Sequence, residues 1–231
     1  MKIISSKSKK ALKAAFPFTL PIFAGFWFLG MSYGIYMNVC GFSWIYPALM
    51  SLTIFAGSVE FIAVNLLLGS FNPIQSFILA FIVNARHLFY GISMLEKYRG
   101  LGLKKFYLIF GLCDESFSIN YTAKIPEGVD RGLFYFWITF LNQLYWVSGA
   151  NLGGIFGSLI KFDTHGLEFI LTSLFVVIFL EQFMKEKNHL NAWTGFFASF
   201  LCLMIFGAEN FILPSIAVIL IFLTIFRRKL E

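Results

Sequence analysis

The sequence predicts an all-α, polytopic integral membrane protein: a helical bundle of about seven or eight hydrophobic segments, some of them broken or re-entrant. Hydrophobic residues make up 58% of the 231 residues, charged residues make up 13%, and the mean hydropathy is +0.78. A soluble domain has about 25% charged residues. Apolar runs close to the roughly 20 residues that a membrane helix needs follow one another along the chain, joined by short polar connections.

These runs define the expected membrane segments. They lie at residues 16–37, 44–69, 73–95, 104–122, 131–156, 167–184, 192–206 and 210–227. Several contain residues that interrupt helices. Pro17 and Pro21 lie in the first, "AGSVE" at 56–60 interrupts the second, and "GAEN" at 207–210 separates the last two. Because proline and glycine disturb a regular helix, we expect some segments to be discontinuous.

Basic residues cluster beside the apolar segments. The clusters are Lys2, Lys7, Lys9, Lys10 and Lys13; Lys97, Arg99, Lys104 and Lys105; and Arg227, Arg228 and Lys229. This placement is the positive-inside pattern. The net charge of +6 therefore indicates membrane orientation, with a cytoplasmic N-terminus, and argues against nucleic-acid binding. We expect a basic cytoplasmic leader at 1–13, a single transmembrane domain at 14–227 and a basic tail at 228–231.

The charge pattern conflicts with the number of segments. Three segments separate the basic N-terminus from the basic loop at 96–105, whereas two loops on one side of a membrane require an even number of crossings between them. The same conflict recurs between this loop and the C-terminal cluster. Either one segment in each half does not cross, or charge counting misplaces a loop. Re-entrant segments are tolerated where their backbone lines a cavity or is buried in protein, and in transporters such breaks lie near the substrate.

The segment "FIVNARHLFYGISM", residues 81–94, has an unusual polar face. At 100° per residue, Asn84, His87 and Gly91 fall on one side of a helix, and Arg86 and Tyr90 form a neighbouring stripe. Charged residues within membrane segments are costly. This face is therefore expected to look into the protein or into a water-filled cavity.

Carboxylates occur within the 104–122 segment. Asp114 and Glu115 lie about ten residues after its start, at a depth where Arg86 is the obvious partner. One interpretation is a salt bridge that fixes helix packing. In the other, the pair also changes protonation or binds the substrate.

A further carboxylate, Glu60, follows the small residues Gly57 and Ser58. A backbone break here would expose amide groups that suit a carboxylate ligand, and Glu60 would suit an ammonium group or a proton. The alternative is a capped kink in which Glu60 bonds to a neighbouring helix.

The 131–156 segment has a mixed polar and glycine face. Asn142, Trp146, Gly149 and Gly153 share it at i, i+4, i+7 and i+11, with Gln143 beside it. Glycine at these intervals favours close helix packing. Glu168, Glu181 and Glu209 lie near segment ends, where a hydrated interfacial carboxylate is the simpler interpretation.

Other classes of function have weaker support. Cys40, Cys113 and Cys202 are widely spaced, which gives no metal or disulfide framework. There is no Walker-type glycine loop, and we expect neither a catalytic residue nor a cofactor. An intramembrane hydrolase could use Ser58 or Ser148 with a histidine. His165 and His189 lie in short connections, and His87 adjoins Arg86, which disfavours a histidine base. A passive channel is also disfavoured, because the sequence contains nothing that resembles a repeated selectivity filter.

Four motifs together resemble the AzlC-like family, the large subunit of branched-chain amino acid exporters first linked to azaleucine resistance. They are "FAGSVEF" at 55–61, "NARHLFYG" at 84–91, "DESF" at 114–117 and "GLEFILTSLFVVIFLEQ" at 166–182. The similarity extends from about Ala15 to Phe226. Glu60 departs from the glutamine of many members, and Glu168 departs from the more usual aspartate.

The resemblance implies a permease of the bacterial cytoplasmic (inner) membrane. It would export leucine, isoleucine, valine and sometimes methionine by secondary active transport, expected to be proton-coupled, beside a small hydrophobic AzlD-like subunit. The expected substrate-binding or gating residues are Gly57, Ser58, Glu60, Asn84, Arg86, His87 and Tyr90. The expected proton-coupling or ion-pair residues are Glu60, Asp114, Glu115 and Arg86, with Asn142 and Trp146 as secondary candidates.

Overall fold

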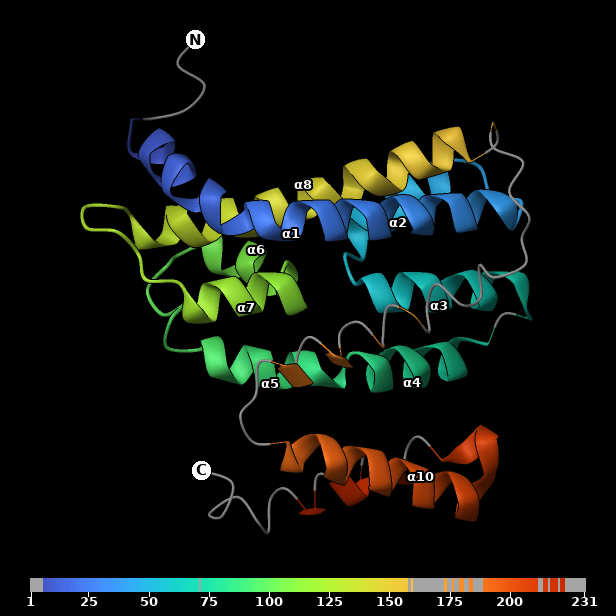
Figure 1. Cartoon of the computed structure of the whole chain (residues 1–231). Coiled ribbons are helices and arrows are strands. Elements are labelled where there is room, and N and C mark those ends of the chain that lie inside the picture. Colours follow the sequence, from blue (N-terminus) through green and yellow to red (C-terminus); the bar gives the residue numbers. More distant parts are fainter. Residues whose placement is uncertain are drawn as a thin grey trace. The chain divides into compact units, whose positions relative to one another are not determined.

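The computed structural model describes residues 6–70, 72–157 and 189–211, together with positions 159, 173, 176, 179–180, 183–184, 214–215, 217–219 and 221–222 (Figure 1). Within these residues the secondary structure is helical, with no strand, as the sequence predicts. Contacts divide the chain into two compact units, Met1–Leu167 and Glu168–Glu231. The expected single transmembrane domain at 14–227 stays a prediction. Each unit is described by itself.

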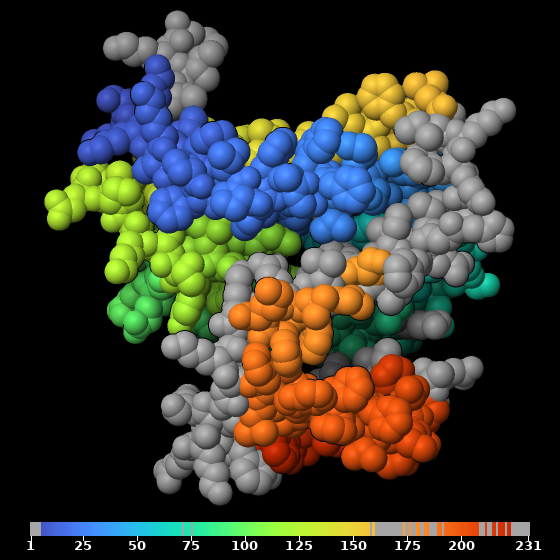
Figure 2. Space-filling model, viewed as in Figure 1, coloured from blue at the N-terminus to red at the C-terminus, as the bar shows by residue number. Residues whose placement is uncertain are grey.

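Unit 1 is built on two long helices that run in the same direction, α1 (Ser6–Val39) and α8 (Arg131–Phe156). Ser8 contacts Trp137 near the start of both helices, and Asn38 donates a hydrogen bond to the Gly154 carbonyl near their ends. Figure 2 shows the blue surface of α1 lying along the yellow surface of α8. Because α1 begins at Ser6, the basic residues Lys7 to Lys13 form its first turns and are continuous with the apolar part.

Glycines bring the backbones of α1 and α8 into direct contact. A Cβ added to Gly30 would lie 2.7 Å from the Trp146 backbone oxygen, and one added to Gly34 would meet the Ala150 oxygen and the Gly154 nitrogen. On α8, Gly149 and Gly153 face the α1 backbone in the same way. Small residues allow this close approach. The packing interpretation of the glycine face is therefore confirmed.

The 44–69 segment consists of two short helices, α2 (Ile45–Thr53) and α3 (Gly57–Leu68), that form a hairpin (Figure 1). Trp44, before α2, lies beside Gly154 near the end of α8, and Leu52 at the other end of α2 lies beside Gln143. Helix α3 then returns: Glu60 contacts Trp146, and Asn65 contacts Tyr36 near the end of α1. The hairpin therefore enters and leaves at the same end of the unit. Phe55, at its tip, has a φ of 48°.

The next segment runs the length of the unit but is bent. Helices α4 (Pro73–Val83) and α5 (Ala85–Met94) meet at Asn84 with an angle of 49° between Ser76–Val83 and Ala85–Met94. Arg131, at the start of α8, donates a hydrogen bond to the carbonyl of Arg99, which follows α5. Helix α5 therefore runs opposite to α8 and ends where α8 begins.

The 104–122 segment forms a second hairpin, α6 (Lys104–Phe110) and α7 (Asp114–Thr122), inserted from the opposite end. Lys104 lies 3.7 Å from Asp130, just before α8, and Gly111 at the tip contacts the Thr139 side chain. Helix α7 returns beside α5, with Asp114 at Arg86 and Tyr121 at Lys97.

Asp130 caps α8 by accepting a hydrogen bond from the Leu133 N–H at 2.7 Å. This bond, together with the nearby Lys104, holds the pKa of the Asp130 carboxyl below its ordinary value.

The two hairpins give a physical reason for the conflict in segment number. Within residues 6–157, α1, the α4–α5 pair and α8 run the length of the unit, whereas both hairpins return to the end where they entered. By length and composition, α1 qualifies as a membrane span, as does the bent α4–α5 pair if it is one span. The expected total of seven or eight segments stays a prediction.

In unit 2, α10 (Leu190–Asn210) contains the expected 192–206 segment. Its backbone is kinked at Gly207, where φ is 74°, at the predicted interruption. The 167–184 and 210–227 segments lie mostly outside the described residues, as do Glu168, Glu181 and the basic residues Arg227, Arg228 and Lys229. The side chain of Glu209 also lies outside them.

The α1–α8 contact makes a direct prediction. Gly34→Ala should lower stability by about 1–3 kcal/mol, because the added methyl group would clash with backbone atoms of α8. These atoms can move only if the whole helix shifts. Gly25→Ala is the matched control in the same helix, because a Cβ there meets no atom within 4 Å in the part of the chain that the structure describes. It should be neutral or slightly stabilising. Thermal unfolding of the purified variants in detergent measures both, and equal shifts in melting temperature would contradict the packing.

Candidate functional site

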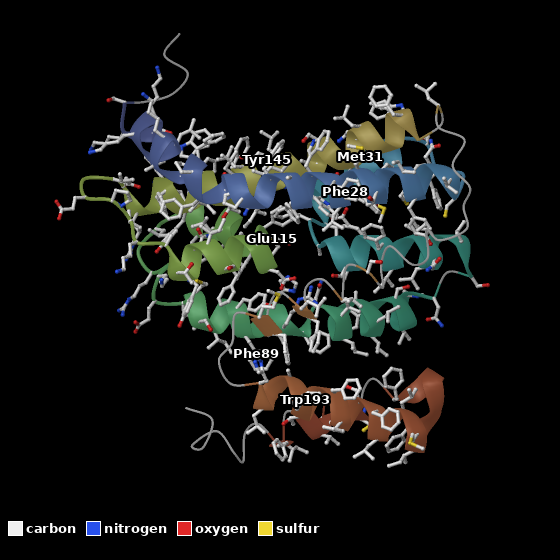
Figure 3. The ribbon with its side chains drawn as sticks, in the orientation of Figure 1. Phe28, Met31, Phe89, Glu115, Tyr145 and Trp193 are labelled. Carbon is white, nitrogen blue, oxygen red and sulfur yellow. The ribbon has the colours of Figure 1, made fainter. Side chains whose placement is uncertain are left out.

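Three helix breaks meet in the middle of unit 1, at residues 54–56, 84 and 111–113, which we call the helix junction. The first turns of α3, α5 and α7 all begin there. Figure 3 shows Glu115 at the start of α7 in this region. Helix N-termini have unpaired amide groups and about half a positive charge each. The junction therefore brings three positive helix ends together. Side chains pair some of the backbone groups at the breaks, since Glu60 accepts from the Ala56 N–H and Ser116 accepts from the Cys113 N–H.

Arg86 connects these helix ends. Its Nε and Nη2 donate to Asp114 Oδ1 and Oδ2 at 2.9 and 2.8 Å, which is a bidentate ion pair. Its Nη2 also donates to Ser58 Oγ at 3.2 Å, and its Nη1 donates to the Val83 carbonyl at 3.1 Å. One guanidinium thus contacts α3, the end of α4 and α7.

Asp114 has one further partner. The Tyr90 hydroxyl donates to Oδ1 at 2.7 Å, one turn beyond Arg86 on α5. The side chains of Arg86 and Asp114 are 32% and 21% exposed, so the pair lies within the structure without being sealed from solvent. The predicted partnership of Arg86 with one of the two acids is confirmed, and the structure selects Asp114. Glu115 occupies the next position in the first turn of α7.

Glu60 lies in a different environment. Its side chain is fully buried, and its Oε1 accepts hydrogen bonds from the Ala56 N–H at 3.0 Å and from Trp146 Nε1 at 3.1 Å. Oε2 also accepts from Trp146 Nε1 at 3.1 Å. Gly57 leaves room for this contact, because a Cβ there would lie 2.9 Å from the Trp146 ring.

These contacts agree with the alternative interpretation of Glu60, in which it caps the helix break at Ala56 and bonds to a neighbouring helix. Glu60 therefore connects the tip of the first hairpin to α8. The described part of the chain contains no ion pair to it.

The face of α5 beside the Arg86 and Tyr90 stripe lines a pocket of about 310 Å³. The lining residues are Phe81, Asn84, Ala85, His87, Leu88, Gly91, Ile109 and Leu112. His87 Nδ1 lies 3.2 Å from the Asn84 carbonyl oxygen. Asn84, His87 and Gly91 thus share one face, as the periodicity predicts, while Arg86 and Tyr90 bind Asp114 on the neighbouring stripe.

Asn142 lies on α8 between two residues that contact the hairpin tips. Thr139 contacts Gly111 of one tip, and Trp146 contacts Gly57 of the other. The Asn142 side chain is fully buried, and neither its Oδ1 nor its Nδ2 has a hydrogen-bond partner among the described residues. Its neighbour Gln143 accepts from the Tyr107 hydroxyl at 2.6 Å and donates to the Leu52 carbonyl at 3.3 Å, so it joins both hairpins to α8.

The hydrolase alternative would need a serine hydroxyl bonded to a histidine, and the described residues contain no such contact. Ser58 bonds to Arg86, and Ser148 donates to the Tyr145 carbonyl of its own helix. His165 lies outside the described residues. No group of three potential metal ligands occurs in the part of the chain that the structure describes.

Sequence reasoning missed several residues of the site. Tyr107 lies between apolar residues in the short helix α6, and the lysines at the start of that helix belong to the predicted basic loop, so nothing singles Tyr107 out. Ile109 and Leu112 cannot be distinguished by type from the many other apolar residues. The only local signal is Gly111 beside them, which marks the tip of the hairpin.

Comparison with known proteins identifies the family. The profile described as "AzlC protein" matches residues 21–160, which include the whole helix junction. The chain belongs to the AzlC family. No solved structure matches this AzlC-family chain.

Relatives are similar along most of their length. The Bacillus subtilis "Branched-chain amino acid transport protein AzlC" is 61% identical over 96% of this chain and 87% of its own. An "Uncharacterized membrane protein" of Haemophilus influenzae is 46% identical over 98% of this chain and 93% of its own. The Escherichia coli "Inner membrane protein YgaZ" is 25% identical over 74% of this chain and 72% of its own.

The Glu60 environment makes a testable prediction. Trp146→Phe removes the one side-chain donor that the described residues provide to a fully buried carboxylate and should cost about 1–3 kcal/mol of stability. Trp137→Phe on the same helix is the control. Its indole bonds to the hydroxyl of Ser8, which is only partly buried, so water can replace that partner. Chemical denaturation of both variants tests the difference, and equal losses would argue against a structural role for the Glu60 contact.

Proposed function

We propose that the protein is a secondary active transporter that exports branched-chain amino acids across the bacterial inner membrane. Its proposed substrates are leucine, isoleucine and valine, with methionine as a further one. The observation that supports this proposal best is the helix junction, where a partly buried ion pair and three helix N-termini lie beside a mostly apolar pocket. The name of the Bacillus relative, a branched-chain amino acid transport protein, agrees with it.

A zwitterionic amino acid needs both kinds of charge when it leaves water. Helix N-termini and Arg86 suit its carboxylate, and the carboxylates of the junction suit its ammonium group. An apolar pocket with a few polar groups suits its side chain. Interrupted helices whose ends meet near the middle of the protein provide this combination in other secondary transporters.

Export is expected to be coupled to protons, with Glu60, Asp114 and Glu115 as the candidate proton carriers. The chain is expected to work with a small hydrophobic AzlD-like subunit. The end of unit 1 that holds Lys97, Arg99, Lys104 and Lys105 is expected to face the cytoplasm, because basic residues gather on that side. The start of α1 lies at the same end, where Ser8 contacts Trp137.

The transport proposal is tested by export from proteoliposomes. Vesicles containing the wild-type protein, with and without the small subunit, should lose leucine faster under a proton gradient than empty vesicles. Arg86→Ala should reduce this flux at least about tenfold, since it leaves Asp114 without its charge partner. Arg131→Ala is the control, because Arg131 lies exposed at the basic end. Equal leucine loss from leucine-loaded vesicles with and without the protein would contradict the proposal.

The two hairpins predict which loops share a side of the membrane. In a Cys40→Ser background, the variants Ser43→Cys and Asn72→Cys should react with an impermeant maleimide from outside the cell. Glu96→Cys and Glu127→Cys should react only after the membrane is opened. The remaining Cys113 and Cys202 are buried. If the 44–69 segment crossed completely, positions 43 and 72 would be labelled from opposite sides.

A further inference from the structure

The pocket on α5 has a lining that suits one part of an amino acid. We propose that it is the subsite for the aliphatic side chain of the transported amino acid, and that Gly91 sets the largest side chain it accepts. This inference rests on the proposed function. Its supporting observations are the shape and chemistry of the pocket, which are independent of the relatives.

The pocket has apolar walls and a polar end. Phe81, Leu88, Ile109 and Leu112 supply hydrocarbon from α4, α5 and the tip of the second hairpin. Asn84 and His87 are its polar members. The volume of about 310 Å³ is at the lower end of the range for small-molecule sites, about 300–1,000 Å³, so it fits a small ligand.

The polar end has groups available to a ligand. His87 Nδ1 is engaged by the Asn84 carbonyl oxygen, which leaves Nε2 without a hydrogen bond to any described residue. The Asn84 Oδ1 atom is buried and has no partner among the described residues. An ammonium group beside Leu88 and Leu112 would supply the donor that Asn84 Oδ1 lacks, once the Asn84 side chain turns toward the pocket.

Gly91 determines how much space the pocket contains. A Cβ added at Gly91 would meet no atom of the described residues within 4 Å, so none of these residues requires glycine there. Glycine is also a weaker helix former than alanine, and Gly91 lies within the regular helix α5. The consequence of glycine at this position is open volume beside Asn84 and His87.

The test compares substrates of increasing size. Proteoliposomes with the wild-type protein, Gly91→Leu, Leu112→Ala or Gly25→Leu are loaded with alanine, valine, leucine or phenylalanine, and the efflux of each is measured. Gly25 on α1 is the matched control, because a Cβ there also meets no atom within 4 Å. It is absent from the pocket lining.

Gly91→Leu should lower the ratio of leucine to alanine efflux by about tenfold or more, because one methylene group changes discrimination in an apolar pocket about 10–200-fold. Leu112→Ala should shift the ratio in the opposite direction and admit phenylalanine. Gly25→Leu should keep the wild-type ratio. Binding of leucine and alanine to the purified proteins should change in parallel.

Two other results have different meanings. If the wild-type protein exports leucine and Gly91→Leu keeps its substrate ratio, the subsite is overturned while the proposed function stands. That result would fit a pocket filled by a lipid chain, since Phe81, Leu88 and Ile109 are about half exposed. A wild-type protein that neither binds nor exports any of these amino acids would overturn the proposed function and the subsite together.

Discussion

Arg86 contacts three chain segments that are far apart in the sequence: Ser58 at the start of α3, Val83 at the end of α4 and Asp114 at the start of α7. A guanidinium removed from water requires a paired anion and further hydrogen-bond acceptors. These three residues supply both. The requirement to satisfy Arg86 therefore brings the tips of two hairpins and the bend of α4–α5 together, and the pocket on the neighbouring face of α5 lies beside them.

The interruptions themselves need compensation, because each helix break releases backbone groups that bilayer lipid cannot satisfy. Side chains supply much of it. Glu60 accepts from the Ala56 N–H, Gln143 donates to the Leu52 carbonyl, and Ser116 accepts from the Cys113 N–H. The glycine contact between α1 and α8 provides a rigid support for the hairpins. In a transporter, such a junction would allow local movement of the tips without loss of the long helices.

Part of this arrangement follows from residue type and spacing. Arginine within an apolar run predicts an inward-facing polar site, and the period of α5 separates the Asn84 and His87 face from the Arg86 and Tyr90 stripe. The break near Gly57 has a local signal in "AGSVE". The bend at Asn84 has neither proline nor glycine, and the choice of Asp114 over Glu115 depends on the position of α7. The Glu60–Trp146 contact joins residues 86 positions apart, so no local pattern could predict it.

The central claim is that the Arg86–Asp114 pair holds the junction together. The most direct test is a double-mutant cycle of unfolding free energy with Arg86→Gln, Asp114→Asn and the double variant in detergent. Each single change leaves one partner without its counter-charge and should cost about 1–3 kcal/mol, because both side chains are only partly buried and water screens the remaining charge. The double variant should cost clearly less than the sum. Additive losses, or single changes without effect on stability, would contradict the claim.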